Sequence, residues 1–186
     1  MVALPITGSV EADTLLETNP LALLIGMLLD QQVTMELAFK GPHTLDVRLH
    51  GLDAATVASM PLDEFIQVCA EPPAIHRYPK MMGTRVHELC QAVVSEYGGH
   101  ADRVWTEATN GKDLRARLLA LPGFGEQKAK IFIALLAKRF GVQPEGWEQA
   151  AKPYSDEYPR SVADVTGAES LEAVREWKKS MKASKR

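Results

Sequence analysis

The residues of this chain that are best suited to chemistry form a short glycine-containing hairpin, Leu121-Pro122-Gly123-Phe124-Gly125. Its two glycines can adopt positive φ angles and can leave backbone N–H groups without side-chain cover. An apolar-periodic segment long enough to be a helix flanks the hairpin on each side, and the second segment begins at Glu126. A helix that opens on exposed amides binds anions, and we expect the anion to be a nucleic-acid phosphate.

Basic side chains gather near this hairpin although the protein as a whole is slightly acidic, with a formal net charge of −3. Lys128 and Lys130 follow the hairpin within one helical turn, so we expect both to contact DNA. The C-terminal tail adds a second basic group, which we interpret as a solvated face, with DNA contact as the alternative. Its members are Lys178, Lys179, Lys182, Lys185 and Arg186.

The element most able to support the hairpin is an apolar helix near the N-terminus. Asn19 is a typical N-cap and Pro20 a typical first helical residue, and leucines at helical spacing follow as far as Leu29. Because this segment is apolar almost all round, it predicts a central, buried helix. It ends in a sudden polar patch, Asp30-Gln31-Gln32-Val33-Thr34, which serves either to solvate the helix end or to contact a ligand.

The rest of the chain favours an all-α fold. No segment shows strand alternation, and the periodicity predicts about ten helices in one domain. The longest predicted helices cover residues 80–97, 112–120, 126–140 and 168–183. We expect the helix that begins near Met35 to end at Gly41-Pro42, because proline interrupts helical hydrogen bonding.

Cysteine content and hydropathy limit the compartment and the cofactors. Cys69 and Cys90 are far apart and flanked by apolar residues, so we expect buried, reduced thiols. Two cysteines cannot form a four-cysteine iron–sulfur or zinc site, and we expect neither a metal nor a cofactor. No apolar run approaches the length of a membrane span, and the N-terminus lacks the pattern of a signal peptide, so we expect a cytoplasmic protein.

Together, the hairpin, the apolar helix with its polar end and the long helix over 80–97 resemble the helix–hairpin–helix (HhH-GPD, endonuclease III-like) superfamily of DNA glycosylases. The resemblance covers roughly residues 19–150. It implies a two-lobed helical fold, with residues of about 30–125 in one lobe and the termini plus 126–186 in the other. It also implies a nucleoid-associated monomer whose partner is double-stranded DNA with a damaged or mismatched base. The chain resembles a divergent, cluster-less member, because the four cysteines that usually follow the hairpin are absent.

The resemblance assigns roles to both polar regions. In the superfamily, hairpin amides hold a backbone phosphate, which here implies contacts from Gly123 to Gly125 and at Gln127. A polar residue at the end of the central helix fills the gap that a flipped-out base leaves in the duplex. Gln32 matches that wedge position, with Thr34 beside it.

One departure from the superfamily concerns the nucleophile. Bifunctional members carry a lysine two residues after the last hairpin glycine, where this chain has Gln127, and an amide is not an amine nucleophile. Lys128 is the next residue, but one step along a helix turns a side chain by about 100°, so we expect it to point along the DNA backbone. These residues favour a monofunctional glycosylase, which hydrolyses the N-glycosidic bond without a lyase step. A non-catalytic DNA-structure or lesion-binding protein is the alternative.

A second departure concerns the catalytic acid. The superfamily uses an aspartate beyond the second hairpin helix, to stabilise the oxocarbenium-like state or to activate water. Aligning the helix end at Phe140-Gly141 implies Glu148 as the first candidate and Glu145 as the second, with solvated surface acids as the alternative. Asp156 and Asp164 are remoter candidates.

The sequence leaves two alternatives for the aromatic residue that would stack on an extruded base. Tyr78 or His76 could stack on such a base, because both lie in a loop that could face the cleft. Simple packing or surface exposure is the competing interpretation for each of them.

Overall fold

The structure is a computed structural model that describes residues 4–185, and within this range its regular elements are all helical. This confirms the all-α prediction. The helices are α1 Val10–Thr18, α2 Pro20–Leu29, α3 Met35–Leu49, α4 Ala54–Ser59, α5 Leu62–Ala70, α6 Pro79–Tyr97, α7 Arg103–Thr106, α8 Gly111–Ala120, α9 Glu126–Phe140, α10 Trp147–Ala151, the 3-10 helix η1 Val162–Asp164, and α11 Ala168–Ala183.

The apolar helix α2 is the central element, as its sequence predicts. The Asn19 side chain accepts hydrogen bonds from the N–H groups of Leu21 and Ala22 at 3.0 and 3.3 Å, so it caps the helix. Its amide nitrogen also donates to the Leu52 carbonyl at 2.9 Å, which fixes the helix start to the loop before α4. Every residue from Leu21 to Leu29 is buried.

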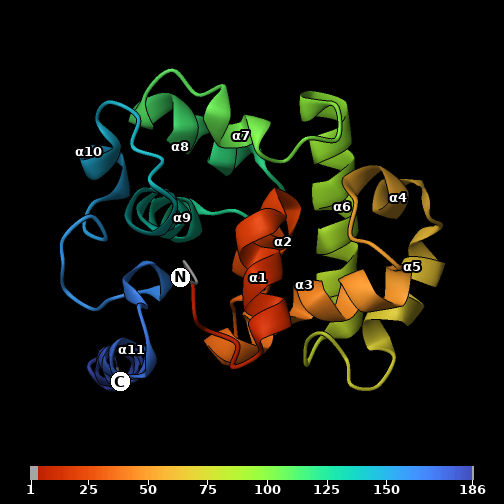
Figure 1. Cartoon of the computed structure of the whole chain (residues 1–186), viewed down its shortest axis with the longest axis horizontal. Helices are drawn as coiled ribbons and strands as arrows, with labels where there is room; N and C mark the ends of the chain where they lie inside the picture. Colours follow the sequence, from red (N-terminus) through yellow and green to blue (C-terminus); the bar gives the residue numbers. More distant parts are fainter. Residues whose placement is uncertain (1–3, 186) are drawn as a thin grey trace.

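Two groups of helices lie on either side of α2 (Figure 1). Helices α3 to α6 form one group, and α8 to α11 form the other. Helix α2 packs mainly against α3 and also contacts α6 and α9, while α8 packs against α9 and α10. The chain passes from the first group to the second between α6 and α8. The polar end of α2 and the hairpin before α9 meet where the two groups join.

Helix α3 contradicts one expectation, because it runs through Gly41-Pro42 instead of ending there. Proline at this position removes one helical hydrogen bond. Close packing holds the segment helical nonetheless: Pro42 is buried, and a Cβ atom at Gly41 would lie 2.6 Å from Leu29 Cδ1. The helix stays intact because tertiary packing against α2 outweighs the local preference of the sequence.

The two cysteines behave as expected. Cys69 and Cys90 are buried and unpaired, and burial raises the pKa of each thiol to about 12. Both thiols therefore remain protonated and act as small apolar groups in the core.

No single helix in residues 4–185 has the length and hydropathy to cross a membrane. Helices α1 and α2 reach that length only as a pair, which is bent by 113°, and α2 is buried inside the protein.

Candidate functional site

The connection between α8 and α9 is a tight turn. Helix α8 ends with the Leu121 N–H donating to the Leu118 carbonyl at 3.0 Å, and the Phe124 N–H then donates to the Leu121 carbonyl at 3.2 Å. Between them Gly123 has φ +80°, in the left-handed region that favours glycine. The two helices that the sequence predicts around this turn are therefore confirmed.

The first turn of α9 opens without a side-chain cap. Gly125 is its N-cap, and the Ala129 N–H donates to the Gly125 carbonyl at 3.0 Å. The amides of residues 126–128 precede that bond and have no helical acceptor. Because Gly125 and Gln127 are both exposed, an anion can reach these amides from solvent.

The hairpin is fixed to the C-terminal half of α2 by close packing. A Cβ atom at Gly123 would lie only 2.1 Å from Leu28 Cδ1, so the backbone of the turn rests directly on that fully buried side chain. Phe124 is also buried and meets Phe132 edge-on at a ring-centroid distance of 5.9 Å. These contacts hold the α9 amides close to the polar end of α2.

Lys128 adds a polar link to the same junction. Its Nζ donates to the Leu28 carbonyl at 2.5 Å, so the ammonium group lies between α9 and α2. This differs from the expected position along a DNA backbone, because the rotation from Gln127 to Lys128 turns the side chain inward. Burial lowers the pKa of Lys128 to about 8, and nearby Asp30 acts in the opposite direction.

The loop after α2 presents Gln32 in an unusual conformation. Gln32 has φ +57° and is exposed, although glutamine rarely adopts this backbone region. The loop beneath it is held by His76, whose Nε2 donates to the Gln31 carbonyl at 2.9 Å and whose Nδ1 accepts the Tyr78 N–H at 3.1 Å. A non-glycine residue held at positive φ on a well-anchored loop is a candidate functional residue.

His76 itself is not available to a ligand. It is 1% exposed, and burial lowers its pKa, so it remains neutral and serves to connect two loops. Tyr78 is exposed but belongs to a separate surface beside Arg77 and α6. Neither residue lies at the pocket described next.

A pocket of about 540 Å³ brings the predicted polar regions together. Gln32 and Gln127 both line it, from the end of α2 and the first turn of α9. Tyr154, in the segment after α10, and Trp177 of α11 also line it. The Gln127 amide donates to the Tyr154 hydroxyl at 3.1 Å, which joins α9 to the segment after α10.

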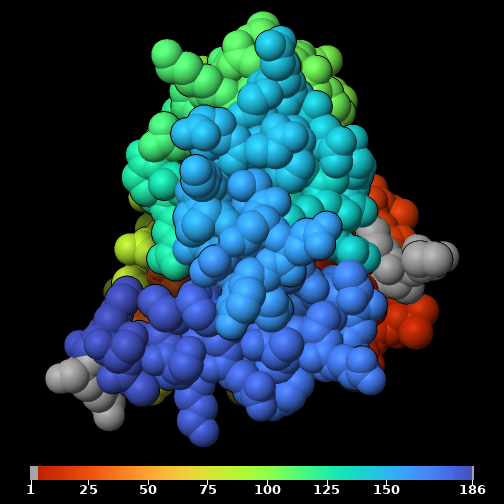
Figure 2. Space-filling view, turned by 90° about the vertical axis from the view of Figure 1, so that its left-hand side faces the viewer, coloured from red at the N-terminus to blue at the C-terminus, as the bar shows by residue number. Residues whose placement is uncertain are grey.

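Basic side chains from the end of the chain surround this pocket. Helix α11 lies across the lower part of the face shown in Figure 2, below the segment that follows α10. Arg160, Lys178, Lys182 and Lys185 line the pocket. The tail lysines Lys178, Lys182 and Lys185 therefore lie at the same pocket as Gln32 and Gln127.

A second, adjoining pocket of about 690 Å³ extends the basic surface. It shares Gln32, Lys178 and Lys182 with the first, and it adds Arg77, Arg175 and Lys179. We call the two pockets together the basic cleft. Its lining has seven basic side chains against two carboxylates, those of Asp30 and Glu36, although the whole protein carries a net charge of −3.

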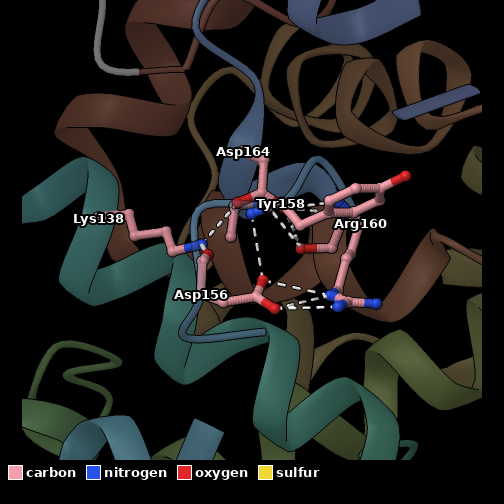
Figure 3. A network of polar contacts seen from close by, with 7 residues as sticks. Lys138, Asp156, Tyr158, Arg160 and Asp164 are labelled. Atoms are coloured by element: carbon pink, nitrogen blue, oxygen red, sulfur yellow. Dashed lines mark hydrogen bonds and ion pairs between the residues drawn. The ribbon is translucent and has the colours of Figure 1, made fainter. Parts of the chain in front are cut away.

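A network of polar contacts holds Arg160 at the edge of the cleft (Figure 3). Arg160 donates to Asp156 at 2.9 Å, and its guanidinium lies 5.0 Å from the ring centroids of both Tyr158 and Trp177. The hydrogen bond from Arg160 is the largest cause that lowers the pKa of Asp156. Lys138 joins this segment to α9 through Asp164 at 2.6 Å. Asp156 and Asp164 are thus engaged in structural ion pairs and do not line the pocket.

The two glutamates that the resemblance implies lie outside the pocket. Glu145 and Glu148 are both exposed, in the α10 region that packs against α8 and α9, and neither is a lining residue. In the described chain, Asp30 is the one carboxylate that lines the 540 Å³ pocket. It is the C-cap of α2, and its side chain is 9% exposed. In the sequence, Asp30 can be recognised as an acidic residue that directly follows an entirely apolar helix.

The remaining predicted residues have varied positions. Thr34 is the N-cap of α3, where its hydroxyl accepts the Leu37 N–H at 3.4 Å, and it also lines the adjoining pocket. Lys130 is half-buried on α9 and lines neither pocket. Between residues 4 and 185, no three His, Cys, Asp or Glu side chains come together in a way that could hold a metal ion.

Comparison with known proteins yields no counterpart: no family model, no curated protein and no solved structure matches this chain.

Proposed function

We propose that the protein binds duplex DNA along the basic cleft and removes a damaged or mismatched base by hydrolysing its N-glycosidic bond. The observation that carries this proposal is the meeting of two features at one pocket. Gln32, on a strained and exposed turn, lines the same pocket as Gln127 in the uncapped first turn of α9, and three lysines of the α11 segment also line it.

The binding step uses contacts that do not read sequence. The free amides at the start of α9 suit a backbone phosphate, because both their direction and the helix dipole favour an anion. Lys178 and Lys182 suit further phosphates along the strand. Such contacts fix the position of the protein on the duplex and give an affinity that depends steeply on salt.

The extrusion step uses Gln32 and the pocket. An enzyme that acts on the glycosidic bond has to rotate its base out of the duplex, at a cost of roughly a few kcal/mol. Gln32 is placed to fill the space that the base leaves. The pocket volume of about 540 Å³ is within the range of roughly 300–1,000 Å³ that is typical of ligand sites. Trp177 and Tyr154 line its wall and offer aromatic surface to the extruded base.

The hydrolysis step uses water as the nucleophile. Gln127 offers an amide where a lyase needs an amine. Lys128 has the depressed pKa of a reactive lysine, but its ammonium group is bonded to the Leu28 carbonyl and does not line the pocket. An amine that does not reach the pocket cannot form a Schiff base with the sugar.

The decisive experiment incubates the protein with a panel of duplexes that each carry one damaged or mismatched base. For at least one duplex we expect release of the free base and an abasic strand that breaks only after alkali treatment. Borohydride should trap no covalent adduct. Gln32→Ala should lower base release at least tenfold while binding to an undamaged duplex changes little, because Gln32 acts only when the base leaves the stack.

The other outcomes separate the competing functions. A borohydride-trapped complex would contradict the monofunctional mechanism. Binding to lesion duplexes without release of any base would favour the non-catalytic lesion binder, an alternative supported by the remote positions of Glu145 and Glu148. Failure to bind any duplex at low salt would exclude both and leave a helical protein without a nucleic-acid role.

The role of α11 can be measured through the salt dependence of binding. Each lost phosphate contact lowers the slope of log affinity against log salt by about 0.9. The double variant Lys178→Gln/Lys182→Gln should therefore lower that slope by about 2 and weaken binding at low salt. Lys40→Gln/Lys112→Gln removes the same charge from exposed positions that line neither pocket, and its slope should match the wild type. Equal slopes for both double variants would show that DNA does not contact α11.

A further inference from the structure

We propose that Asp30 is the catalytic carboxylate of this pocket, and that it accepts a proton from the water that attacks the sugar. This proposal rests on the proposed glycosylase function and names the group that performs its chemical step. It replaces Glu148 and Glu145 in that role.

The first argument is position. Asp30 follows α2 directly and is two residues from Gln32, and it lines the same pocket as Gln32 and Gln127. A group that fills the place of an extruded base and a group that acts on that base have to lie close together. Glu148 does not meet this requirement, because it is exposed and is not among the lining residues of the pocket.

The second argument is energetic. A carboxylate at the C-terminal end of a helix faces the negative end of the helix dipole, which is unfavourable. The side chain of Asp30 is also 9% exposed, and a charge so far from water is costly unless it is paired. An acidic residue in this position therefore lowers the stability of the folded protein, and residues that lower stability locally are common at functional sites.

Two lysines, Lys178 and Lys128, partly neutralise the Asp30 carboxylate. Neither of them forms a hydrogen bond with its Oδ1 atom. Lys178 Nζ lies 3.5 Å from Asp30 Oδ2, a long ion pair. Lys128 donates to the Leu28 carbonyl at the same helix end and interacts with Asp30 electrostatically. Within residues 4–185, the other oxygen, Oδ1, makes no hydrogen bond, so it can accept one from a water molecule.

The chemical step is then a simple hydrolysis. The water oxygen attacks C1′ of the deoxyribose, one water proton moves to the Asp30 carboxylate, and the C1′–N bond breaks with its electron pair going to the base nitrogen. Asp30 then gives the proton to the departing base, directly or through water, so that the products are a neutral free base and an abasic sugar. As the bond breaks, the same carboxylate also stabilises the positive charge that develops on the sugar.

The test compares three variants in single-turnover base release at saturating protein, alongside their affinity for the same lesion duplex. Asp30→Asn keeps the shape and removes the charge, and it should lower the saturated rate at least 100-fold while Kd changes less than threefold. Lys178→Met breaks the same ion pair from the other side, so it should weaken binding several-fold and lower the saturated rate by less than threefold. Glu148→Gln should match the wild-type rate.

Each contrary result has a distinct meaning. If Lys178→Met lowers the saturated rate as much as Asp30→Asn, Asp30 acts only by holding α11 and is not catalytic. If Asp30→Asn keeps its rate while Glu148→Gln loses it, the acid is Glu148. Either result leaves the proposed function intact. Wild-type protein that binds lesion duplexes but releases no base would instead remove the hydrolysis and the role of Asp30 together.

A melting curve of each variant shows whether a lost rate reflects lost structure. Asp30→Asn removes an unfavourable charge from the end of α2, but it also leaves Lys128 and Lys178 without their counter-charge, so its melting temperature reports the balance of the two effects. If it does fall, Asp30→Ser provides the same comparison with a smaller side chain, since serine also lacks the carboxylate. A stable Asp30→Ser protein with the wild-type rate would equally overturn the assignment.

Discussion

Replacing Gly123 by alanine should destabilise the protein by about 2–5 kcal/mol and should weaken the DNA binding that we propose. Gly123 has φ +80°, and a residue with a Cβ atom in this region costs roughly 1–2 kcal/mol. The new Cβ atom would lie 2.1 Å from Leu28 Cδ1, and overpacking a core typically costs about 1–3 kcal/mol more. Leu28 is fully buried, so the clash is relieved either by a change of its rotamer in the core or by movement of the hairpin, which carries the α9 amides with it.

Urea unfolding of wild type and variant measures the loss, and the chain supplies a matched control two residues away. Gly125 has φ −91° and no atom within 4 Å of the position of a Cβ, so Gly125→Ala should cost only the roughly 0.5–1 kcal/mol by which alanine is a poorer N-cap than glycine. In a Leu28→Ala background, which removes the clashing group, Gly123→Ala should cost only the backbone term of roughly 1–2 kcal/mol. An equal cost in both backgrounds would show that the hairpin does not pack on Leu28.

Replacing Lys128 by methionine should change how stability depends on pH. The pKa of Lys128 is about 8 in the folded protein against 10.5 for an unburied lysine, because burial disfavours the charged form. Between these two values the unfolded chain binds one more proton than the folded chain, so this group makes wild-type stability rise with pH. Below pH 8 the folded protein carries a buried ammonium group at an energetic cost.

Methionine fills a similar volume without a charge, so Lys128→Met avoids that cost. Relative to wild type, the variant should therefore be at its most stable near pH 7 and should lose about 1–3 kcal/mol of that advantage by pH 10.5, after allowance for solvent screening. The lost hydrogen bond to the Leu28 carbonyl lowers stability by the same amount at each pH at which Lys128 is charged. Chemical denaturation at intervals between pH 7 and 10 gives the difference directly.

Lys130→Met is the control, because it removes one positive charge from a half-buried position on the same helix. The other groups that titrate between pH 7 and 10 are the same in the wild type, Lys128→Met and Lys130→Met. Their contributions to the free energy of unfolding therefore cancel when these proteins are compared. The same pH trend in Lys130→Met would show that the trend reflects the charge of α9 in general. It would then say nothing about the burial of Lys128.

Local sequence signals were sufficient to predict much of the fold. Asn19 and Pro20 mark the start of α2, the glycines at 98 and 141 end α6 and α9, and apolar periodicity predicts the bounds of α11. These signals depend on residues a few positions apart, so no knowledge of the tertiary structure is needed to interpret them. Helix α3 differs because its continuation through Pro42 depends on packing against α2, which a local pattern does not contain.

The site could be predicted only in part, for the same reason. The hairpin and Gln32 stand out because their residue types are unusual beside apolar helices, and the structure brings Gln32 and Gln127, two residues after the hairpin, to one pocket. The inward direction of Lys128 and the position of Asp30 beside Lys178 depend on contacts across 100 and 148 residues of chain. The residues next to a lysine in the sequence do not show which surface of the protein its side chain will face.

The basic cleft also has a consequence for how the protein meets its partner. Because the net charge is −3 while seven cationic groups lie around the cleft, the negative charge has to be concentrated elsewhere on the surface. An uneven charge distribution of this kind favours one orientation of the molecule in the field of a polyanion before contact. Under the proposed function, encounters with DNA should therefore be fast and correctly oriented at low ionic strength.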